Sequence, residues 1–229
     1  MLHGFLPSLI EGAGTTMLLA VCSLLIAVVL GMLGALMKLS RSIVLKGIAT
    51  VYTTVIRGVP DLVLMLLIFY GGQLAINELG TRVGMREVVD INPFIAGVAT
   101  IGFIFGAYLT ETFRGAMMTV PLGQREAGIA YAMTPTQVFV RITLPQMVRF
   151  ALPGFTNNWL VLVKSTALVS VIGLSDMMNR AGLAAGTTRE PFTFYMTVAA
   201  LYLVITSVSI LLLKALEKRF SLGVRVVSL

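Results

Sequence analysis

The chain of 229 residues is far more apolar than a soluble protein of its size. Hydrophobic residues make up 57% of the sequence, charged residues make up 12%, and the mean hydropathy is +0.95. Soluble domains carry about 25% charged residues, so this composition excludes an ordinary soluble domain and indicates a membrane protein. The net charge of +7 could suggest a nucleic-acid partner, but its alternation along the chain argues against one.

Five stretches of the sequence are long and apolar enough to cross a bilayer, which takes about 20 residues per helix. We expect them at residues 12–37, 58–77, 91–112, 150–174 and 191–214, in a single transmembrane domain of residues 1–229. Too little chain remains for a separate soluble domain. The first stretch lacks a preceding basic region and is too long for a cleaved signal peptide.

Lysine and arginine alternate between successive loops. Net positive charge falls in the loop after the first span, in the loop after the third span and in the C-terminal tail, whereas the other two loops and the N-terminal segment have none. The positive-inside rule therefore predicts an N-terminus outside the cell and a C-terminus inside it.

Residue types needed for catalysis or metal binding are scarce. Cys22 is the only cysteine and His3 the only histidine, so neither a histidine-based metal cluster nor a Ser-His-Asp triad can form. The sequence also lacks a GxxxxGK[ST] phosphate-binding loop. We therefore expect no catalytic residue and no metal site, and any nucleotide hydrolysis to take place in another subunit.

Residues 121–149, between the third and fourth spans, carry helix signals of their own. Pro121 begins this loop, and residues 122–132 are rich in helix-forming side chains. Thr134 before Pro135 starts a second short helix, because the hydroxyl can cap it and proline suits the first helical position.

The second short helix of this loop has an apolar patch at Val138, Phe139 and Ile142. We expect Pro145 to end that helix and Pro153 to begin the fourth span. The loop would then be a sharply bent surface on the inner face that another protein could grip. The alternative is an amphipathic loop that rests in the lipid headgroups, and the arginines of the loop suit both interpretations.

The loop resembles the EAA loop of ATP-binding cassette (ABC) importer permeases. The residues that match are Glu126, Ala127, Ile142, Leu144 and Pro145. Gly128 stands where the motif has its second alanine, and Ala132 stands where it has a glycine. Both exchanges are between small residues, but Ala132 raises the question of how sharply the chain bends there.

Motifs along the rest of the chain resemble the polar amino-acid uptake subfamily of these permeases. They lie at residues 57–60, 64–70, 106–108, 110–115, 157–158 and 164–168. Within the subfamily the chain is similar to a permease subunit of the histidine and lysine/arginine/ornithine importer. The usual layout of the subfamily, five spans with the N-terminus outside, agrees with the charge pattern.

The resemblance implies an all-α transmembrane protein of the bacterial inner membrane, with the five-helix type I ABC importer permease fold and a cytoplasmic EAA coupling loop. It implies translocation of polar, above all cationic, L-amino acids such as histidine, arginine, lysine and ornithine. The implied partners are a second homologous permease (a distinct chain or a second copy), an ABC ATPase dimer that binds ATP and Mg, a periplasmic substrate-binding protein and the lipid bilayer. This chain itself would bind no cofactor.

The same resemblance implies which residues couple the permease to the ATPase. They are Glu126, Ala127, Gly128, Ala130, Ala132, Met133, Ile142, Leu144 and Pro145. Glu126 would bond as an exposed charge at a groove of the ATPase, and the apolar side chains around Ala130 and Met133 would supply the packing. We call residues 121–149 the coupling loop below.

Ionisable residues within the spans are candidates for the substrate pathway, because each is costly to insert at the bilayer centre. Asp61 and Glu111 are hypothesised to receive a cationic group of the substrate. The alternative is that both lie near the inner surface and pair with Arg57 and Arg114.

Lys164 lies halfway along the fourth span, in a polar stretch. The polar residues near it are Asn157, Asn158, Ser165 and Thr166. Residues seven positions apart share a helix face, so Asn157 should lie on the face of Lys164 and Asn158 on that of Ser165. The pathway interpretation places Lys164 at a substrate carboxylate; in the alternative, Lys164 snorkels or neutralises an acidic residue of the bundle, Asp61 or Glu111.

Two pairs of glycines have the four-residue spacing that lets helices approach closely. Gly102 and Gly106 fit such an approach within the third span, although ordinary glycine frequency in membrane helices is the alternative. Gly182 and Gly186 fall in the outer loop, where we expect a hinge or turn.

Two charged residues, Asp176 and Arg180, follow the fourth span at the outer face. We expect solvated loop charges there, or contacts with the binding protein. Two other function classes are open: a secondary amino-acid transporter or channel subunit, and an assembly subunit that never contacts cargo. The EAA-like loop argues against the first, and the polar stretch around Lys164 argues against the second.

Overall fold

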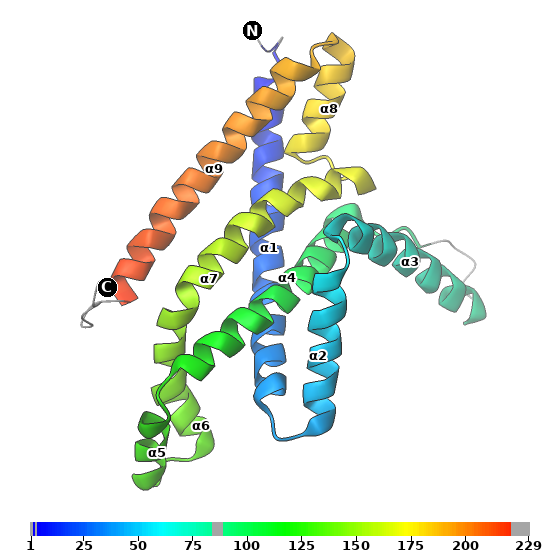
Figure 1. The fold of residues 1–229 in the computed structure, drawn as a ribbon. Coiled ribbons are helices and arrows are strands. Elements are labelled where there is room, and N and C mark those ends of the chain that lie inside the picture. Colours follow the sequence, from blue (N-terminus) through cyan, green and yellow to red (C-terminus); the bar gives the residue numbers. More distant parts are fainter. Residues whose placement is uncertain (1, 3, 84–88, 221–229) are drawn as a thin grey trace.

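The computed structural model describes residue 2, residues 4–83 and residues 89–220, and this part of the chain is almost entirely helical (Figure 1). Five helical stretches are long and apolar enough to cross a membrane. They are α1 (Leu6–Leu39), α3 (Asp61–Arg82), α4 (Pro93–Thr119), the run Pro135–Ile172 and α9 (Pro191–Phe220). The predicted all-α, membrane-spanning class is confirmed. His3 and the charges of Arg86, Glu87 and Arg225 lie outside the described residues.

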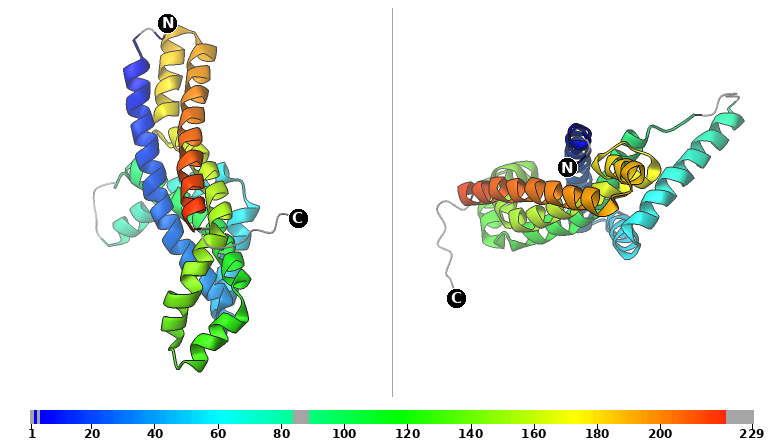
Figure 2. Two further views of the ribbon diagram at one scale, coloured as in Figure 1. Left: turned by 90° about the vertical axis from the view of Figure 1, so that its left-hand side faces the viewer. Right: turned by 90° about the horizontal axis from the view of Figure 1, so that it is seen from above.

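Shorter helices connect the long ones. They are α2 (Ile43–Gly58), α5 (Leu122–Ala130), α6 (Pro135–Val138) and α8 (Met177–Thr188). Most of the basic loop after the first span is therefore helix α2. The coupling-loop helices α5 and α6 lie at the end of the molecule opposite α8 and the N-terminus (Figures 1 and 2).

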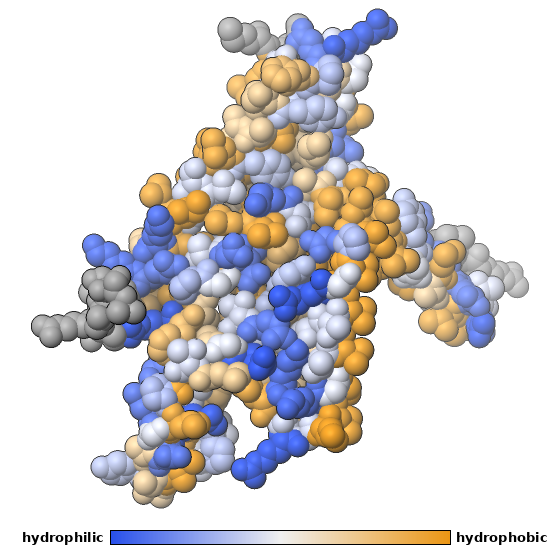
Figure 3. Space-filling view, viewed as in Figure 1, coloured by the Kyte–Doolittle hydropathy of each residue, from blue (hydrophilic) through white to orange (hydrophobic). Residues whose placement is uncertain are grey.

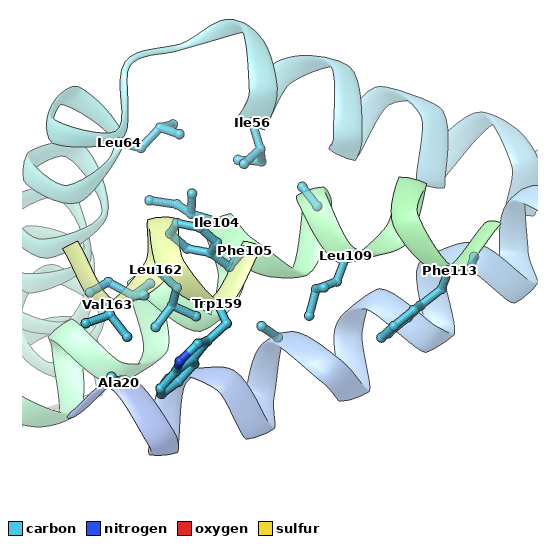
Figure 4. Packing of buried hydrophobic residues seen from close by; sticks show 14 of the residues in the cluster. Ala20, Ile56, Leu64, Ile104, Phe105, Leu109, Phe113, Trp159, Leu162 and Val163 are labelled. Atoms are coloured by element: carbon cyan, nitrogen blue, oxygen red, sulfur yellow. The ribbon is translucent and has the colours of Figure 1, made fainter. Parts of the chain in front are cut away.

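Helices α1 and α4 form the centre of the core. A Cβ atom added at Gly102 would lie 2.7 Å from Ile26 Cβ, and one at Gly106 would lie 2.8 Å from Leu30 Cβ. The close-approach interpretation of this glycine pair is therefore confirmed, and the partner is α1 of the same chain. Side chains from α2, α3 and α7 (Leu144–Ser165) complete the cluster around Phe105 (Figure 4).

The fourth span runs on from the coupling loop without a break, so the expected boundaries at Pro145 and Pro153 are wrong. Helix α6, the π-helical turn η1 (Phe139–Thr143), α7 and the 3-10 turn η2 (Thr166–Ile172) form one helical run. The N–H of Leu144 bonds to the carbonyl of Phe139, five residues back, so the chain widens just before Pro145. Pro153 lies inside α7, as membrane helices tolerate when neighbouring helices support them.

A second, smaller cluster of buried side chains joins α8 to the outer parts of α1 and α9. Its buried members are Leu9, Met177, Ala181, Ala184, Ala185, Phe194 and Val198. The expected hinge or turn at Gly182 and Gly186 is wrong, because both glycines lie within α8. The buried alanines of α8 pack against α1 and α9, which is why this outer segment is a helix and not a solvated loop.

Candidate coupling and substrate surfaces

The coupling loop is a tight helical hairpin that matches its local signals. Thr134 accepts a hydrogen bond from the N–H of Gln137, whose side chain accepts one from the N–H of Thr134, so the predicted start of the second helix is confirmed as a capping box. The two arms cross at Gly128, where a Cβ atom would lie 2.7 Å from Ile142 Cδ1 and 3.1 Å from Val138 Cγ2. Glycine at the second-alanine position thus brings α5 close to η1.

The bend between the arms is at Ala132, which has a φ of +57°. This left-handed conformation is the one that glycine adopts freely, and the EAA pattern has its glycine at this position. The sharpness of the bend is therefore kept in this chain, at a cost in backbone strain. Compared with the EAA motif, the two small residues have changed places: Gly128 stands at the alanine position and Ala132 at the glycine position.

Ala132→Gly should raise the free energy of unfolding by roughly 1 kcal/mol, because an L-residue in the left-handed region is strained and glycine is not. Ala130→Gly is the matched control: Ala130 ends the helix α5, so glycine there should lower stability by up to about 1 kcal/mol. Equilibrium unfolding of the two variants measures both changes. A loss of stability in both would contradict this account of the bend.

The tip of the coupling loop exposes apolar side chains beside its charged residue. Glu126, Ala127 and Ala130 are all exposed, as the coupling prediction requires. Tyr131 is 86% exposed and Ile129 is 63% exposed. These two side chains are absent from the predicted coupling set. The sequence feature that could have identified them is their position beside Ala130, in an apolar stretch of an otherwise polar loop.

Two polar residues, Asn157 and Lys164, lie with Val161 on one exposed face of α7, which is called the exposed stripe below. Asn157, Val161 and Lys164 are exposed at positions that recur on one side of the helix, so the predicted shared face of Asn157 and Lys164 is confirmed. Among the described residues, Lys164 has no ion-pair or hydrogen-bond partner. Figure 3 shows hydrophilic residues gathered down the middle of this face of the molecule.

The other polar residues of the fourth span are turned towards the protein interior. Asn158 Nδ2 donates to Thr112 Oγ1 on α4 at 2.9 Å and to the carbonyl of Gly154 at 2.9 Å. Thr166 is fully buried and donates to the carbonyl of Val163 at 2.6 Å. The bond from Asn158 to Thr112 joins α7 to α4, whereas that of Thr166 stays within its own helical run. These two predicted pathway residues therefore do not belong to the exposed stripe, and Ser165 is half-buried between the two sets.

Asp61 is the first residue of α3 and is half-buried. Among the described residues, it forms no ion pair. Arg57, the expected alternative partner, instead places its guanidinium carbon 5.5 Å from the centre of the Tyr108 ring on α4. The expected Asp61–Arg57 pair is therefore not present in this structure, and the half-buried carboxylate of Asp61 is left without that partner.

Glu111 binds two cations and is fully engaged. Lys38 Nζ, at the end of α1, bonds to Glu111 Oε1 and to Thr53 Oγ1 of α2, the latter at 2.6 Å. Arg114 Nε lies 3.2 Å from Glu111 Oε2, so the pairing alternative for Glu111 is confirmed. Lys164 therefore does not neutralise Glu111. The part played by Lys38, which ties α1, α2 and α4 together, was missed because the sequence places it in a basic loop.

The two outer charges are held within the protein's own contacts, contrary to the expectation of solvated loop charges. Asp176 is fully buried, and Arg180 Nη1 bonds to Glu11 Oε2 at 2.7 Å and to Ser8 Oγ at 3.2 Å. Packing of α8 against α1 removes Asp176 from solvent and leaves the paired Arg180 side chain 19% exposed. Within the described ranges, no group of three or more histidine, cysteine, aspartate or glutamate side chains could hold a metal ion.

Comparisons with known proteins agree with this geometry. Residues 27–222 match the family described as "Binding-protein-dependent transport system inner membrane component". The chain is 51% identical to the histidine/lysine/arginine/ornithine transport system permease protein HisQ of Escherichia coli (strain K12), over 98% of each chain. It is 40% identical to the octopine transport system permease protein OccQ of Rhizobium radiobacter, over 98% of this chain and 97% of that one.

A solved structure has the same fold. It is described as the crystal structure of an amino acid ABC transporter with histidines, and its matching chain superimposes with a TM-score of 0.79 and 33% identity, over 94% of this chain and 95% of that one. The predicted type I ABC importer permease fold is thereby confirmed, as is a multi-pass protein of the inner membrane. The chain belongs to the family of binding-protein-dependent transport system inner membrane components and is an ABC importer permease subunit.

Proposed function

We propose that this chain is one of two permease subunits that translocate cationic L-amino acids, with histidine, lysine, arginine and ornithine as the candidate cargo. The name of the Escherichia coli relative gives these four amino acids for the transport system of that protein. A second homologous permease, either distinct or another copy of this chain, would complete the pathway. A binding protein would deliver the amino acid outside, and an ATPase dimer with its ATP and Mg would bind the coupling loop inside.

The proposed orientation places the N-terminus and α8 in the periplasm and the C-terminus in the cytoplasm. Two independent features support it. Lysine and arginine are concentrated in the loops that this orientation places inside. The coupling loop and α8 also lie at opposite ends of the molecule (Figure 1), so the loop faces the ATPase when α8 faces the binding protein.

The observation that carries the substrate proposal is a pair of opposite charges without partners among the described residues. Asp61 and Lys164 both lie within membrane-spanning helices, where an unpaired charge is costly unless it faces a water-filled pathway or a ligand. A cationic amino acid carries groups complementary to both. Asp61 would receive its side-chain cation and Lys164 its carboxylate, with Asn157 on the same exposed stripe.

The continuous helical run from Pro135 to Ile172 supports the proposed coupling. It contains the second arm of the coupling loop and also Lys164. Movement of the loop by the ATPase would therefore displace Lys164 together with the helix, as alternating access by near-rigid bodies requires. Tyr131 and Ile129 would add apolar contact area to the bond made by Glu126.

Uptake by the assembled transporter in proteoliposomes tests the substrate assignment. Asp61→Asn should lower arginine uptake by about 10-fold to 100-fold, because a hydrogen bond to a charged group is worth about 1.5–3 kcal/mol. Uptake of citrulline, a neutral analogue of arginine, should change far less. Lys164→Gln should lower the uptake of both, because both carry the carboxylate.

Glu78→Gln is the matched control for Asp61→Asn, because Glu78 is an exposed carboxylate near the other end of the same helix, where it pairs with Arg82. Its uptake should equal that of the unaltered chain. Full arginine uptake by an Asp61→Asn transporter that assembles normally would remove Asp61 from the pathway. Purification of the chain without an ATPase or a second permease would contradict the subunit assignment itself.

A further inference from the structure

Asp176 is a buried carboxylate with one oxygen left unsatisfied. The residue is fully buried, and its Oδ1 accepts a hydrogen bond from the N–H of Asn179 at 2.8 Å, which caps the start of α8. Its Oδ2 is also buried and has no hydrogen-bond partner among the described residues. A buried charged oxygen without a partner destabilises the conformation that encloses it, so the carboxyl is held there against its preference for water.

Asp176 lies in the short segment that joins η2 to α8, and this segment is called the joint below. Residues 173–176 connect η2 to α8, and Gly173 has a φ of +91°, which glycine adopts without strain. Val169 and Ile172 of η2 belong to the main core, whereas Met177 and Ala181 of α8 belong to the outer cluster. A change at Asp176 would therefore act where the outer cluster meets the core.

The start of α8 is seated closely on α1. A Cβ atom at Gly12 would lie 2.8 Å from Met177 Cα, so the two backbones are nearly in contact. Thr16 Oγ1 accepts a hydrogen bond from the N–H of Met177 at 3.3 Å. Charging of Asp176 cannot be relieved by a small local shift in so close a contact. The relief requires this end of α8 to move away from α1.

Among the described residues, no cationic side chain near this joint forms an ion pair with Asp176. Arg180, on α8 itself, is directed to Glu11 and Ser8 of α1 and to the carbonyl of Ser175. Tyr202 of α9 is near enough to Asp176 for its hydroxyl to interact electrostatically with the carboxylate. That hydroxyl also lies 3.5 Å from the hydroxyl of Thr166. The turn η2 contains no titratable side chain, and Glu190, which precedes α9, is exposed.

We propose that Asp176 is a proton-binding site that sets how firmly the outer helix α8 is joined to α1 and the core. With the proton bound, the neutral carboxyl stays seated and α8 is held in place. With the proton lost, the buried charge favours an opened joint in which the carboxylate reaches water. In the orientation of the proposed function, this joint faces the periplasm and senses the pH outside the cytoplasm.

The pH range of the effect follows from the burial of the carboxyl. Burial raises the pKa of Asp176 to about 6, whereas an exposed aspartate has a pKa of about 3.9. The closed joint therefore binds the proton more tightly than the open one. Its extra stability is complete below about pH 4, is lost as the pH rises towards 6, and stays lost above that. The opening equilibrium should increase by about 100-fold over this range.

Amide hydrogen exchange on the full chain in its purified complex tests the proposal. After correction for intrinsic exchange rates, opening of residues 177–188 should increase by up to about 100-fold between about pH 4 and pH 7. Asp176→Asn should abolish the increase, because asparagine also caps a helix but carries no charge. Asp176→Ser, a second neutral capping residue, serves if the first variant does not assemble.

The control variant is Asp90→Asn, which removes an exposed carboxylate from the other outer loop and should leave the pH dependence intact. A flat profile in the unaltered chain, or the same pH dependence in Asp176→Asn, would overturn the proposal. Because amide exchange requires no cargo, either result leaves the proposed transport function standing. Loss of cargo uptake without a change in exchange would in turn leave this proposal intact.

Discussion

Glu111→Gln should lower the free energy of unfolding by about 3–5 kcal/mol, the usual cost of leaving a buried charge without its partner. The charge left behind is Lys38, whose side chain is 11% exposed and bonds to Glu111 across 73 positions of sequence. Its remaining partner would be the hydroxyl of Thr53, a neutral acceptor. Unfolding in mixed micelles, followed for the purified chain, measures the loss.

A double-mutant cycle separates the coupling energy of this ion pair from other effects of each substitution on stability. Lys38→Met alone should also be destabilising, because it leaves Glu111 with only Arg114, whose side chain is 38% exposed. Lys38→Met combined with Glu111→Gln removes both charges and should recover at least about 2 kcal/mol relative to the sum of the two single changes. Simple additivity would show that the two residues are not coupled. Arg114→Gln should cost about 1 kcal/mol or less, as exposed pairs do.

Gly34→Leu should be at least as damaging, with a loss of about 3 kcal/mol or more, because a leucine side chain has no space between α1 and α4. A Cβ atom at Gly34 would already collide with the side chain of Thr110, which is buried and donates to the carbonyl of Gly106. The helices would have to separate along their closest contact. The amount of folded protein recovered in detergent and its unfolding midpoint report the effect.

Gly14→Leu is the control on the same helix, since a Cβ atom there meets nothing within 4 Å and the position is exposed. It should fold and unfold like the unaltered chain. If the two leucine variants lost stability equally, the cause would be leucine in α1 in general, and the close contact with α4 would not be the explanation.

Features set by a few neighbouring residues were predictable from the sequence. The cap at Thr134, the shared face of Asn157 and Lys164, and the five spans all depend on local signals or on composition. The helix end expected at Pro145 failed because a π-helical turn accommodates the proline, and such a turn leaves no simple pattern in the sequence.

Features that depend on contacts between distant segments were not predictable. The ion pair of Lys38 and Glu111 joins the end of α1 to α4, whereas the sequence places Lys38 in a basic loop and leaves Glu111 between a pathway role and a pair with Arg114. The burial of Asp176 likewise depends on α8 folding back onto α1. The single sequence contains the residues of these contacts, but their spacing along the chain does not show which of them meet.

The unbroken helix from Pro135 to Ile172 makes the fourth span a lever. Its 38 residues correspond to up to about 57 Å measured along the helical path, at ~1.5 Å per residue. A tilt of about 5° at the cytoplasmic end would sweep the far end through about 5 Å, given that length. The run includes the turns η1 and η2, but no connecting loop interrupts it. Under the proposed function, a small movement of the coupling loop at one end would therefore become a displacement as wide as an amino-acid side chain at the other.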